Sequence, residues 1–311
     1  MIKIHKYSLE DKSRWDEFIM ESRNGTFIFL RDYLEYHLDR YTDSSFLFTK
    51  NKRILAVIPG NIEDQSFYSH KGLTYGGFVC SNKVSVLEII EFFQLLNSEL
   101  KKENIKKVIY KPVPYIYHKY PTQEDVYLLH KLGANKVACN ISSVIPLSTR
   151  LRFTTCRKRG IKKGNKFGIE ISESDRYDLF WQMLNENLNR KYSAKPIHSL
   201  EEIVLLKDRF PGNIKLYLAY SEDIAIAGVV VYISSTTVKA QYISITQEGR
   251  RKGALDFLFN ELINNLYSVI PFFDLGTSNG NNGFMLNTNL IFPKQGFGGR
   301  GVVYETYSYN L

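Results

Sequence analysis

The chain has little of the residue types that build cross-links and metal sites. It contains only three cysteines among 311 residues, and Cys80, Cys139 and Cys156 show neither a pairing pattern nor the spacing of metal ligands. The six histidines are scattered in the same way. We therefore expect free thiols in a reducing cytoplasm, with no disulfide framework and no bound metal.

Long apolar runs and familiar catalytic signatures are also missing. No apolar run approaches the roughly 20 residues that a membrane-spanning helix needs. Residues 1–15 lack the apolar stretch of a secretory leader. The sequence has no GxSxG, no HExxH and no phosphate-binding Walker loop. Neither a membrane span nor a nucleophile-bearing or metalloprotease site is therefore expected.

What the chain does have is positive charge gathered in one place. It carries 41 lysines and arginines against 32 acidic residues, but eight of the basic residues lie within 150–169, which contains no acid. Without those eight the balance would be 33 against 32, so the rest of the chain is nearly neutral. Such a segment attracts a polyanion, namely a phosphate, a nucleotide or a nucleic acid, and a solvated helix between domains is the alternative. The eight residues are Arg150, Arg152, Arg157, Lys158, Arg159, Lys162, Lys163 and Lys166.

Two distant stretches of the chain share one pattern. Residues 46–59 and residues 216–229 each contain an apolar run, a short polar turn and a second apolar run. A helix-like segment follows each of them, at 84–100 and at 253–267. Solenoid repeats are only roughly 20–50 residues long, so this longer spacing predicts two copies of one domain.

Each copy reads as three antiparallel strands, a helix, a strand, a second helix and a final strand, which is an α+β arrangement. Ser85 and Glu88 form a capping box ahead of apolar residues at helical spacing, so we expect a helix from about 85 to 102. The basic segment is expected to start a helix near 154 that ends around Gly164. In the second copy, residues 247–254 are expected to form a loop between a strand and a helix.

Three features in this order carry a resemblance to a known family. They are the two copies, the linker RKRGIKKGNKFGIEI at 157–171 and the segment FDLGTSNGNNGFMLNTNLIFPKQGFGGRG at 273–301. Together they resemble the Fem-type (FemAB-like) branch of the GNAT acyltransferase superfamily, over nearly the whole chain. The resemblance implies two tandem GNAT-like domains, residues 1–150 and 151–311, each with a mixed, mostly antiparallel sheet flanked by helices. The first would be the structural or acceptor side, and the second the donor side.

The resemblance implies a donor site after residue 246. GNAT enzymes grip the pyrophosphate of acyl-CoA there with an R/Q-x-x-G-x-G/A loop, whose backbone N–H groups and positive helix end face the anion. This chain matches the pattern only in part, and a basic turn is the alternative. The corresponding loop of the first copy, 76–81, has no positive charge, so the first domain is expected to have lost its donor site. The expected residues for acetyl-CoA or another acyl-CoA are Gln247, Gly249, Arg250, Arg251, Lys252, Gly253 and Ala254.

A second candidate region precedes the capping box formed by Ser199 and Glu202. It mixes cations, a phenol and an imidazole, and we expect Arg190, Lys191 and Tyr192 to bind substrate. The reference pKa of histidine suits a general base near neutrality, so His198 is a candidate catalytic residue. The alternative is that His198 only packs beside the helix cap.

A third candidate is the polar C-terminal stretch together with the strand at 237–246. Amides and hydroxyls at this density suit sugar or peptide groups, although similar loops are common turn chemistry. Tyr242 is a candidate general acid for a leaving thiolate, and Ser278 is a further candidate catalytic residue. The expected substrate-binding residues here are Gln241, Asp274, Asn287 and Lys294.

The resemblance implies direct attack of an amine on a bound acyl donor, with a backbone N–H polarising the acyl carbonyl. The preferred function is an N-acyltransferase that moves an acyl group from acyl-CoA to an amine of an amino-sugar or cell-envelope precursor. One alternative is aminoacyl-tRNA-dependent peptidyl transfer, as in the peptidoglycan-bridge members of the Fem family. Those members often carry a coiled-coil arm, which the stretch between Ser172 and Asn213 lacks. The other alternative is a non-catalytic binding module. The expected partners are a small molecule or nucleotide-linked sugar and, in the first alternative, tRNA.

Overall fold

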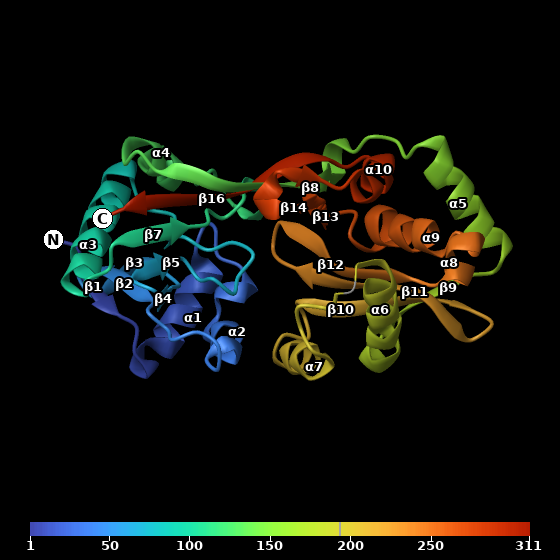
Figure 1. The fold of residues 1–311 in the computed structure, drawn as a ribbon, viewed down its shortest axis with the longest axis horizontal. Helices are drawn as coiled ribbons and strands as arrows, with labels where there is room; N and C mark the ends of the chain where they lie inside the picture. The colour runs from blue at the N-terminus through green and yellow to red at the C-terminus, as the bar shows by residue number, and fades with distance from the viewer. Residues whose placement is uncertain (193) are drawn as a thin grey trace. The chain divides into compact units, whose positions relative to one another are not determined.

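The computed structural model describes residues 1–192 and 194–311, which form two compact units (Figure 1). Unit 1 comprises residues 1–141, 279–285 and 303–311, and unit 2 comprises residues 142–278 and 286–302. Unit 1 thus includes two segments from the C-terminal part of the chain, residues 279–285 and 303–311. The boundary after residue 150 that the sequence predicted places both segments in the second domain. Each unit combines strands with flanking helices, so the predicted α+β class is confirmed.

Unit 1 contains two groups of strands. One is an antiparallel sheet of order β1-β2-β3-β6. In the other, β4, β5, β7 and β16 are neighbours in that order, and only β5 and β7 pair in parallel among the pairs described. The strands are β1 (Lys3–Lys6), β2 (Phe46–Lys50), β3 (Arg53–Ile58), β4 (Asn61–Glu63), β5 (Ser66–Tyr68), β6 (Val79–Cys80), β7 (Lys107–Tyr110), β8 (Asn135–Pro146), β14 (Asn279–Gly280), β15 (Met285–Leu286) and β16 (Arg300–Asn310). β8, β15 and β16 each continue into unit 2.

The main helix of unit 1 follows directly from the sequence. α3 (Val86–Lys102) begins at Ser85, whose side chain accepts the N–H of Glu88, while the Glu88 carboxylate accepts the N–H of Ser85. Its apolar face buries Phe92 and Phe93 against the aromatic core of the unit. The predicted helix is therefore confirmed. The other helices of this unit are α1 (Lys12–Glu21), α2 (Arg31–Leu34) and α4 (Glu124–Lys131).

Unit 2 carries the second copy of the pattern. Its strands follow the order β8-β13-β12-β11-β10-β9, with β12 and β13 parallel and the other pairs antiparallel. The elements are α5 (Thr155–Lys166), β9 (Glu170–Ser174), α6 (Tyr177–Tyr192), α7 (Leu200–Arg209), β10 (Ile214–Ser221), β11 (Ile224–Ile233), β12 (Thr237–Ile245), α8 (Gln247–Lys252), α9 (Ala254–Glu261), a π-helical turn (Leu262–Leu266), β13 (Phe272–Thr277) and α10 (Thr288–Gly296). The basic segment thus forms a helix, α5, as predicted.

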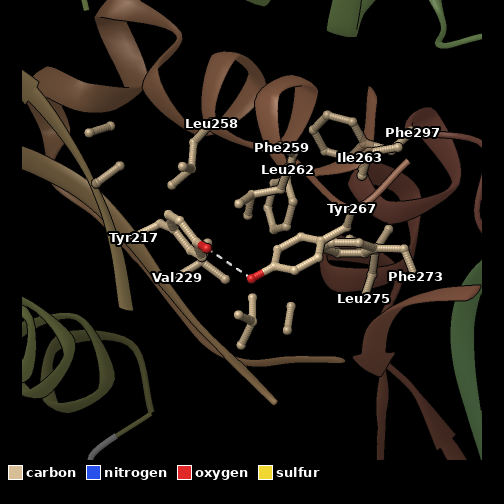
Figure 2. Packing of buried hydrophobic residues seen from close by; sticks show 14 of the residues in the cluster. Tyr217, Val229, Leu258, Phe259, Leu262, Ile263, Tyr267, Phe273, Leu275 and Phe297 are labelled. Carbon is tan, nitrogen blue, oxygen red and sulfur yellow. Dashed lines mark hydrogen bonds between the residues drawn. The ribbon is translucent and has the colours of Figure 1, made fainter. Parts of the chain in front are cut away.

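The core of unit 2 lies where α9 and the π-helical turn pack on the sheet (Figure 2). Leu258 and Leu262 from the helical side meet Val229 from β11 in one buried cluster. The hydroxyls of Tyr217 and Tyr267 are joined by a hydrogen bond of 2.9 Å within this cluster. This packing joins the helical layer to the face of the sheet formed by β10, β11 and β12, beside the strands that form the candidate site.

One local expectation was wrong. Residues 247–252 form the helix α8, not a loop, because Thr246 caps the segment by accepting the N–H of Gly249 at 3.0 Å. Gly253 then adopts a left-handed conformation with φ of 75° and separates α8 from α9.

Candidate functional site

The ladder between β12 and β13 ends early. Their parallel pairing covers only Thr237–Lys239 with Phe272–Asp274. On its other side β12 contains a β-bulge, because Val230 pairs with Tyr242 while Val231 pairs with Ala240, which leaves Gln241 as the extra residue. β-Bulges interrupt regular pairing and are frequent next to active sites. We call residues 239–242 of β12 and residues 274–278, which run from β13 to the residue after it, the β12/β13 junction.

Asp274 is the buried acid of this junction. Its side chain is fully buried, and its Oδ1 accepts the hydroxyl of Ser142 and, at 2.8 Å, the backbone N–H of Gly276. The N–H of Gly276 therefore turns to Asp274 instead of continuing the ladder with β12. Lys239 lies near this carboxylate, and burial lowers the pKa of the Lys239 ammonium while Asp274 opposes the shift.

Lys294 brings a second cation to the junction from α10. Its Nζ donates to the carbonyl oxygens of Gly276 and Thr277, both at 2.8 Å, and to Oγ of Ser278 at 3.1 Å. Burial lowers the pKa of Lys294 to about 8, Asp274 opposes the shift and Lys239 adds to it. A lysine with this pKa is mostly charged at neutral pH and is half-charged only near pH 8.

Ser278 and Asn287 shape the junction mainly through the backbone. Ser278 is fully buried, and its carbonyl oxygen accepts the N–H of Asn287 at 2.8 Å. Asn287 is the N-cap residue of α10, without a side-chain cap bond. Together they close the β14–β15 hairpin and set the start of α10, which carries Lys294. The structure thus brings together Asp274, Ser278, Asn287 and Lys294, four of the residues expected from sequence.

His198 and Tyr242 form a buried pair. The Tyr242 hydroxyl lies 2.5 Å from Nδ1 of His198 and accepts the His198 backbone N–H at 3.3 Å. Which of these two side-chain atoms donates depends on the tautomer of the His198 ring. Burial raises the pKa of Tyr242 to about 12.

This pair ties the loop before α7 to β12. Trp181 of α6 donates its indole N–H to the His198 carbonyl oxygen at 3.2 Å, and its ring meets the Tyr242 ring edge-to-face. Such a network holds the two aromatic rings in place and engages Nδ1 of His198 with the Tyr242 hydroxyl. The geometry therefore favours a positioning role for His198 and Tyr242, whereas the proposed catalytic roles stay predictions.

The remaining residues of the second candidate region are not gathered at the junction. Arg190 is exposed and donates to the side chain of Asn187 at 3.2 Å. The side chains of Lys191 and Tyr192 lie outside the described residues. Asn187 is the better-anchored residue here, because its amide donates to Oγ of Ser244 at 2.7 Å and to the Ile245 carbonyl at 3.0 Å.

The expected donor loop is covered by α5, which packs against α8 and α9 (Figure 1). The carbonyl oxygen of Gly160 lies against Gly253, in the space that a Cβ would need. Gly160 in turn faces the Asp256 carboxylate, and Gly164 packs on the Cβ of Phe257. Gly160 and Gly164 are four residues apart and lie on one face of the helix, and this spacing is the feature of the sequence that indicates a close contact.

The first turn of α9 also contains an acidic side chain that pairs with a cation of α5. Asp256 lies in that turn and accepts Nη1 of Arg157 at 2.6 Å. Burial raises the pKa of Asp256, and Arg157 opposes the shift. Gly249, Gly253 and Ala254 are buried, so their backbone is not presented to a ligand as an open GNAT donor loop requires.

The cations of the expected donor site differ in their surroundings. Arg250 and Arg251 are exposed, whereas Lys252 pairs with Glu248 at 2.8 Å and donates to Ser221 at 2.9 Å. Gln247 is exposed at the start of α8. Among the ion pairs that the described residues form, none includes Arg250, Arg251 or the exposed basic residues of α5. Those α5 residues are Lys158, Arg159, Lys162, Lys163 and Lys166.

Sequence reasoning missed Ser142 and Lys239 as members of the junction. Both lie in strands, where the alternation of apolar and polar residues predicts which side chains are buried but not which of them meet. No local motif therefore identifies them. Within residues 1–192 and 194–311, no three His, Cys, Asp or Glu side chains are grouped in a way that could hold a metal ion. No helix in the described part of the chain combines the length and apolar character that crossing a bilayer requires.

No protein-family model matches the chain, and no curated protein matches it in sequence. Solved structures do resemble it. The crystal structure of FemX is similar with a TM-score of 0.72 and 11% identity, over 99% of this chain and 97% of that chain. The C-terminal domain of a putative lysylphosphatidylglycerol synthetase from Agrobacterium fabrum has a TM-score of 0.61 and 11% identity, over 96% of this chain and 91% of that chain.

A tandem GNAT protein from the clavulanic acid biosynthesis pathway is also similar. Its TM-score is 0.52 at 7% identity, over 100% of this chain and 98% of that chain. Identities this low show a shared fold and nothing finer. The element order of both units, the early end of the β12/β13 ladder and these likenesses lead to one conclusion: the chain has the tandem GNAT fold that it shares with FemX.

Proposed function

We propose that this chain is an acyltransferase that moves an acyl group onto an amine at the β12/β13 junction. The observation that carries the proposal is the position of Lys294 where the ladder ends. Its Nζ and the carbonyl oxygen of Ala240, next to the Gln241 bulge, both lie close to Gly276. A bulged strand leaves backbone groups outside the ladder, and a fixed cation beside them favours negative charge that develops on an acyl oxygen. The arrangement needs no side-chain nucleophile.

The transfer is a direct displacement. The amine nitrogen of the acceptor forms a bond to the acyl carbon, and the bond between that carbon and the donor oxygen or sulfur breaks. The proton that the amine releases ends on the departing group. Lys294, held by three acceptors, favours the tetrahedral oxyanion through its charge. The same charge lowers the pKa of an incoming ammonium, so a larger fraction is the free amine that attacks.

We favour aminoacyl-tRNA as the donor. The N-terminus of α9 is covered by Gly160 and carries its own acid, Asp256, so it does not offer the open amides that a pyrophosphate needs. α5 instead presents exposed lysines and an arginine that have no acidic partner among the described ion pairs. Exposed cations in a row bind a phosphodiester backbone without sequence preference. The fold similarity to FemX supports this choice, because peptidoglycan-bridge members of the Fem family use such donors.

Acyl-CoA, the donor preferred from sequence, is the second candidate. Arg250 and Arg251 favour it, because both are exposed beside the expected donor segment. In this case the diphosphate would bind to side chains and not to the helix N-terminus. An amine of a cell-envelope precursor or of an amino-sugar nucleotide is the proposed acceptor in either case.

The two donors can be separated in one set of measurements. Purified protein is titrated with aminoacyl-tRNA in a filter-binding assay and with acetyl-CoA by calorimetry. Transfer from each donor is then followed with an amino-sugar nucleotide and with a lysine-containing peptide as acceptors. We expect tRNA binding and transfer from aminoacyl-tRNA, and loss of transfer but not of tRNA binding in Lys294→Met. Transfer from acetyl-CoA alone would favour the second candidate, and no transfer with either donor would leave a non-catalytic binding module.

A further inference from the structure

A groove lies between α5 and the layer formed by α9 and the π-helical turn. Its volume is about 420 Å³, which lies in the range of small-ligand sites. It is formed by the extended segment 150–153, one face of α5, and two side chains of α9 and the π-helical turn. The groove therefore lies entirely within unit 2, between elements that pack firmly on each other. The lining residues are Arg150, Leu151, Arg152, Phe153, Lys158, Ile161, Lys162, Asn260 and Asn264.

Four cations converge on this groove. Arg150 and Arg152 are two residues apart in an extended segment, and Lys158 and Lys162 are four apart on one face of α5. No ion pair between described residues includes any of them, and residues 126–169 contain no aspartate or glutamate. Like charges at this helical spacing repel each other, and all four side chains are exposed. A bound anion would relieve this repulsion and would gain from all four charges at once.

The opposite wall offers amides. Nδ2 of Asn264 donates to Oδ1 of Asn260 at 2.9 Å, which fixes the orientation of both side chains. This bond uses one donor of Asn264 and one lone pair of Asn260. The remaining carbonyl and amino groups of the pair suit the edge of a nucleobase, which offers donors and acceptors side by side.

The floor of the groove is apolar and includes a ring. Phe153 packs edge-to-face on Phe297 with ring centroids 5.3 Å apart, so its ring is held in place while part of it stays accessible. A partly exposed aromatic ring gives a flat surface on which any base can stack. The groove therefore offers cations for the phosphate of a nucleotide, amides for the edge of its base and an aromatic ring for the face of its base.

We propose that this groove binds one nucleotide unit, with its phosphate on the four cations and its base between Phe153 and the Asn260–Asn264 pair. The binding itself does not depend on the transfer chemistry, and only the use of the nucleotide as part of the donor rests on the proposed function. The same chemistry is present in a nucleotide of an RNA strand and in the phosphorylated adenosine of CoA. The groove would thus anchor the donor at a place other than the covered helix N-terminus.

The test measures binding of single nucleotides to the full chain by calorimetry. The probes are 5′-AMP, adenosine 3′,5′-bisphosphate as the CoA fragment, ribose 5-phosphate without a base, and a short RNA hairpin. We expect 5′-AMP to bind at least about 10-fold more tightly than ribose 5-phosphate, because the base adds stacking and amide contacts. Tighter binding of the bisphosphate points to CoA as the source, and tighter binding of the hairpin points to RNA.

A matched pair of variants separates the groove from a general basic surface. The double variant Lys158→Gln and Lys162→Gln removes two groove cations, whereas Lys163→Gln and Lys166→Gln removes two cations of α5 that do not line it. We expect the first to weaken 5′-AMP binding about 10-fold and the second to change it less than about 2-fold. Equal effects of the two double variants, or equal affinity for 5′-AMP and ribose 5-phosphate, would overturn the proposal.

The variant Asn264→Leu tests the base-reading wall without changing charge. It should lower the preference for 5′-AMP over ribose 5-phosphate and leave binding of ribose 5-phosphate unchanged. Retained 5′-AMP binding in Lys294→Met, together with lost transfer, separates the groove from the transfer centre. If nucleotides bind although no donor supports transfer, the nucleotide site in the groove is supported and only the proposed transferase function is contradicted.

Discussion

The carbonyl oxygen of Gly160 lies against Gly253, in the space that a Cβ on Gly253 would occupy. This contact joins α5 to the turn between α8 and α9. Because it is made by two glycines, the backbones approach more closely than any other pair of residues allows. The basic helix is thereby fixed over the segment that would otherwise be open at the start of α9.

Replacing Gly253 by alanine tests this contact. Gly253 has φ of 75°, so alanine is strained there and its methyl group also meets the Gly160 carbonyl. We expect the free energy of unfolding, measured by urea denaturation, to fall by about 2–4 kcal/mol. Gly168→Ala is the matched control, because Gly168 has φ of 60° with no heavy atom within 4 Å of the new Cβ. The control should cost only about 1 kcal/mol, and an equal cost for both variants would contradict the close contact.

Transfer should depend on the protonation of Lys294. Its pKa is lowered from 10.5 to about 8, mainly by burial, and the charged form is the one that stabilises the oxyanion. The rate constant kcat should therefore fall as pH rises through about 8. In Lys294→Arg the decline should move to higher pH, because guanidinium keeps its charge, although the rate is lower because its geometry differs. A pH profile that is the same in Lys294→Arg and the original chain would rule out this role.

The same lysine should affect stability with a defined sign. The unfolded chain holds the Lys294 proton up to about 10.5, whereas the folded chain releases it near 8. Between these values the unfolded state binds more protons, so this group makes the free energy of unfolding rise with pH. Urea denaturation between pH 8 and 10 should show this rise, and Lys294→Met should reduce it. Parallel pH curves for the two proteins would show that burial does not shift this pKa.

Removing the Tyr242 hydroxyl tests the buried pair. In Tyr242→Phe, Nδ1 of His198 and its backbone N–H both lose their partner. We expect the free energy of unfolding to fall by about 1–3 kcal/mol, the cost of leaving buried polar groups unsatisfied. Tyr127→Phe, at an exposed position, should be nearly neutral. A positioning role also predicts an unchanged pH profile of kcat, so a shifted profile would instead favour Tyr242 as the general acid.

The exposed face of α5 should govern the salt dependence of tRNA binding. Replacing Arg159, Lys163 and Lys166 by glutamine should weaken binding at low salt and reduce the slope of log K against log salt by about one per lost phosphate contact. Lys101→Gln, on the exposed C-terminal turn of α3, is the control and should leave the slope unchanged. An unaltered slope in the triple variant would show that the RNA does not lie on α5.

The sequence alone determined the features whose signals are local. The capping box of Ser85 and Glu88 sets the start of α3, because both groups lie within one helical turn. The order of strands and helices in the two copies, and the helix in the basic segment, follow in the same way from periodicity over a few residues. These signals were sufficient for the fold class.

Only the tertiary structure decided the chemistry of the candidate site. Tyr242 and His198 are 44 residues apart and Ser142 and Asp274 are 132 apart, so no window of sequence shows that they meet. Thr246 caps the helix at 247–252 locally, but α5 covers the turn that follows it because Gly160 and Gly253 let two distant backbones touch. Charge and hydrogen bonding act through space once the chain has folded, and the shifted pKa of Lys294 exists only in that folded environment.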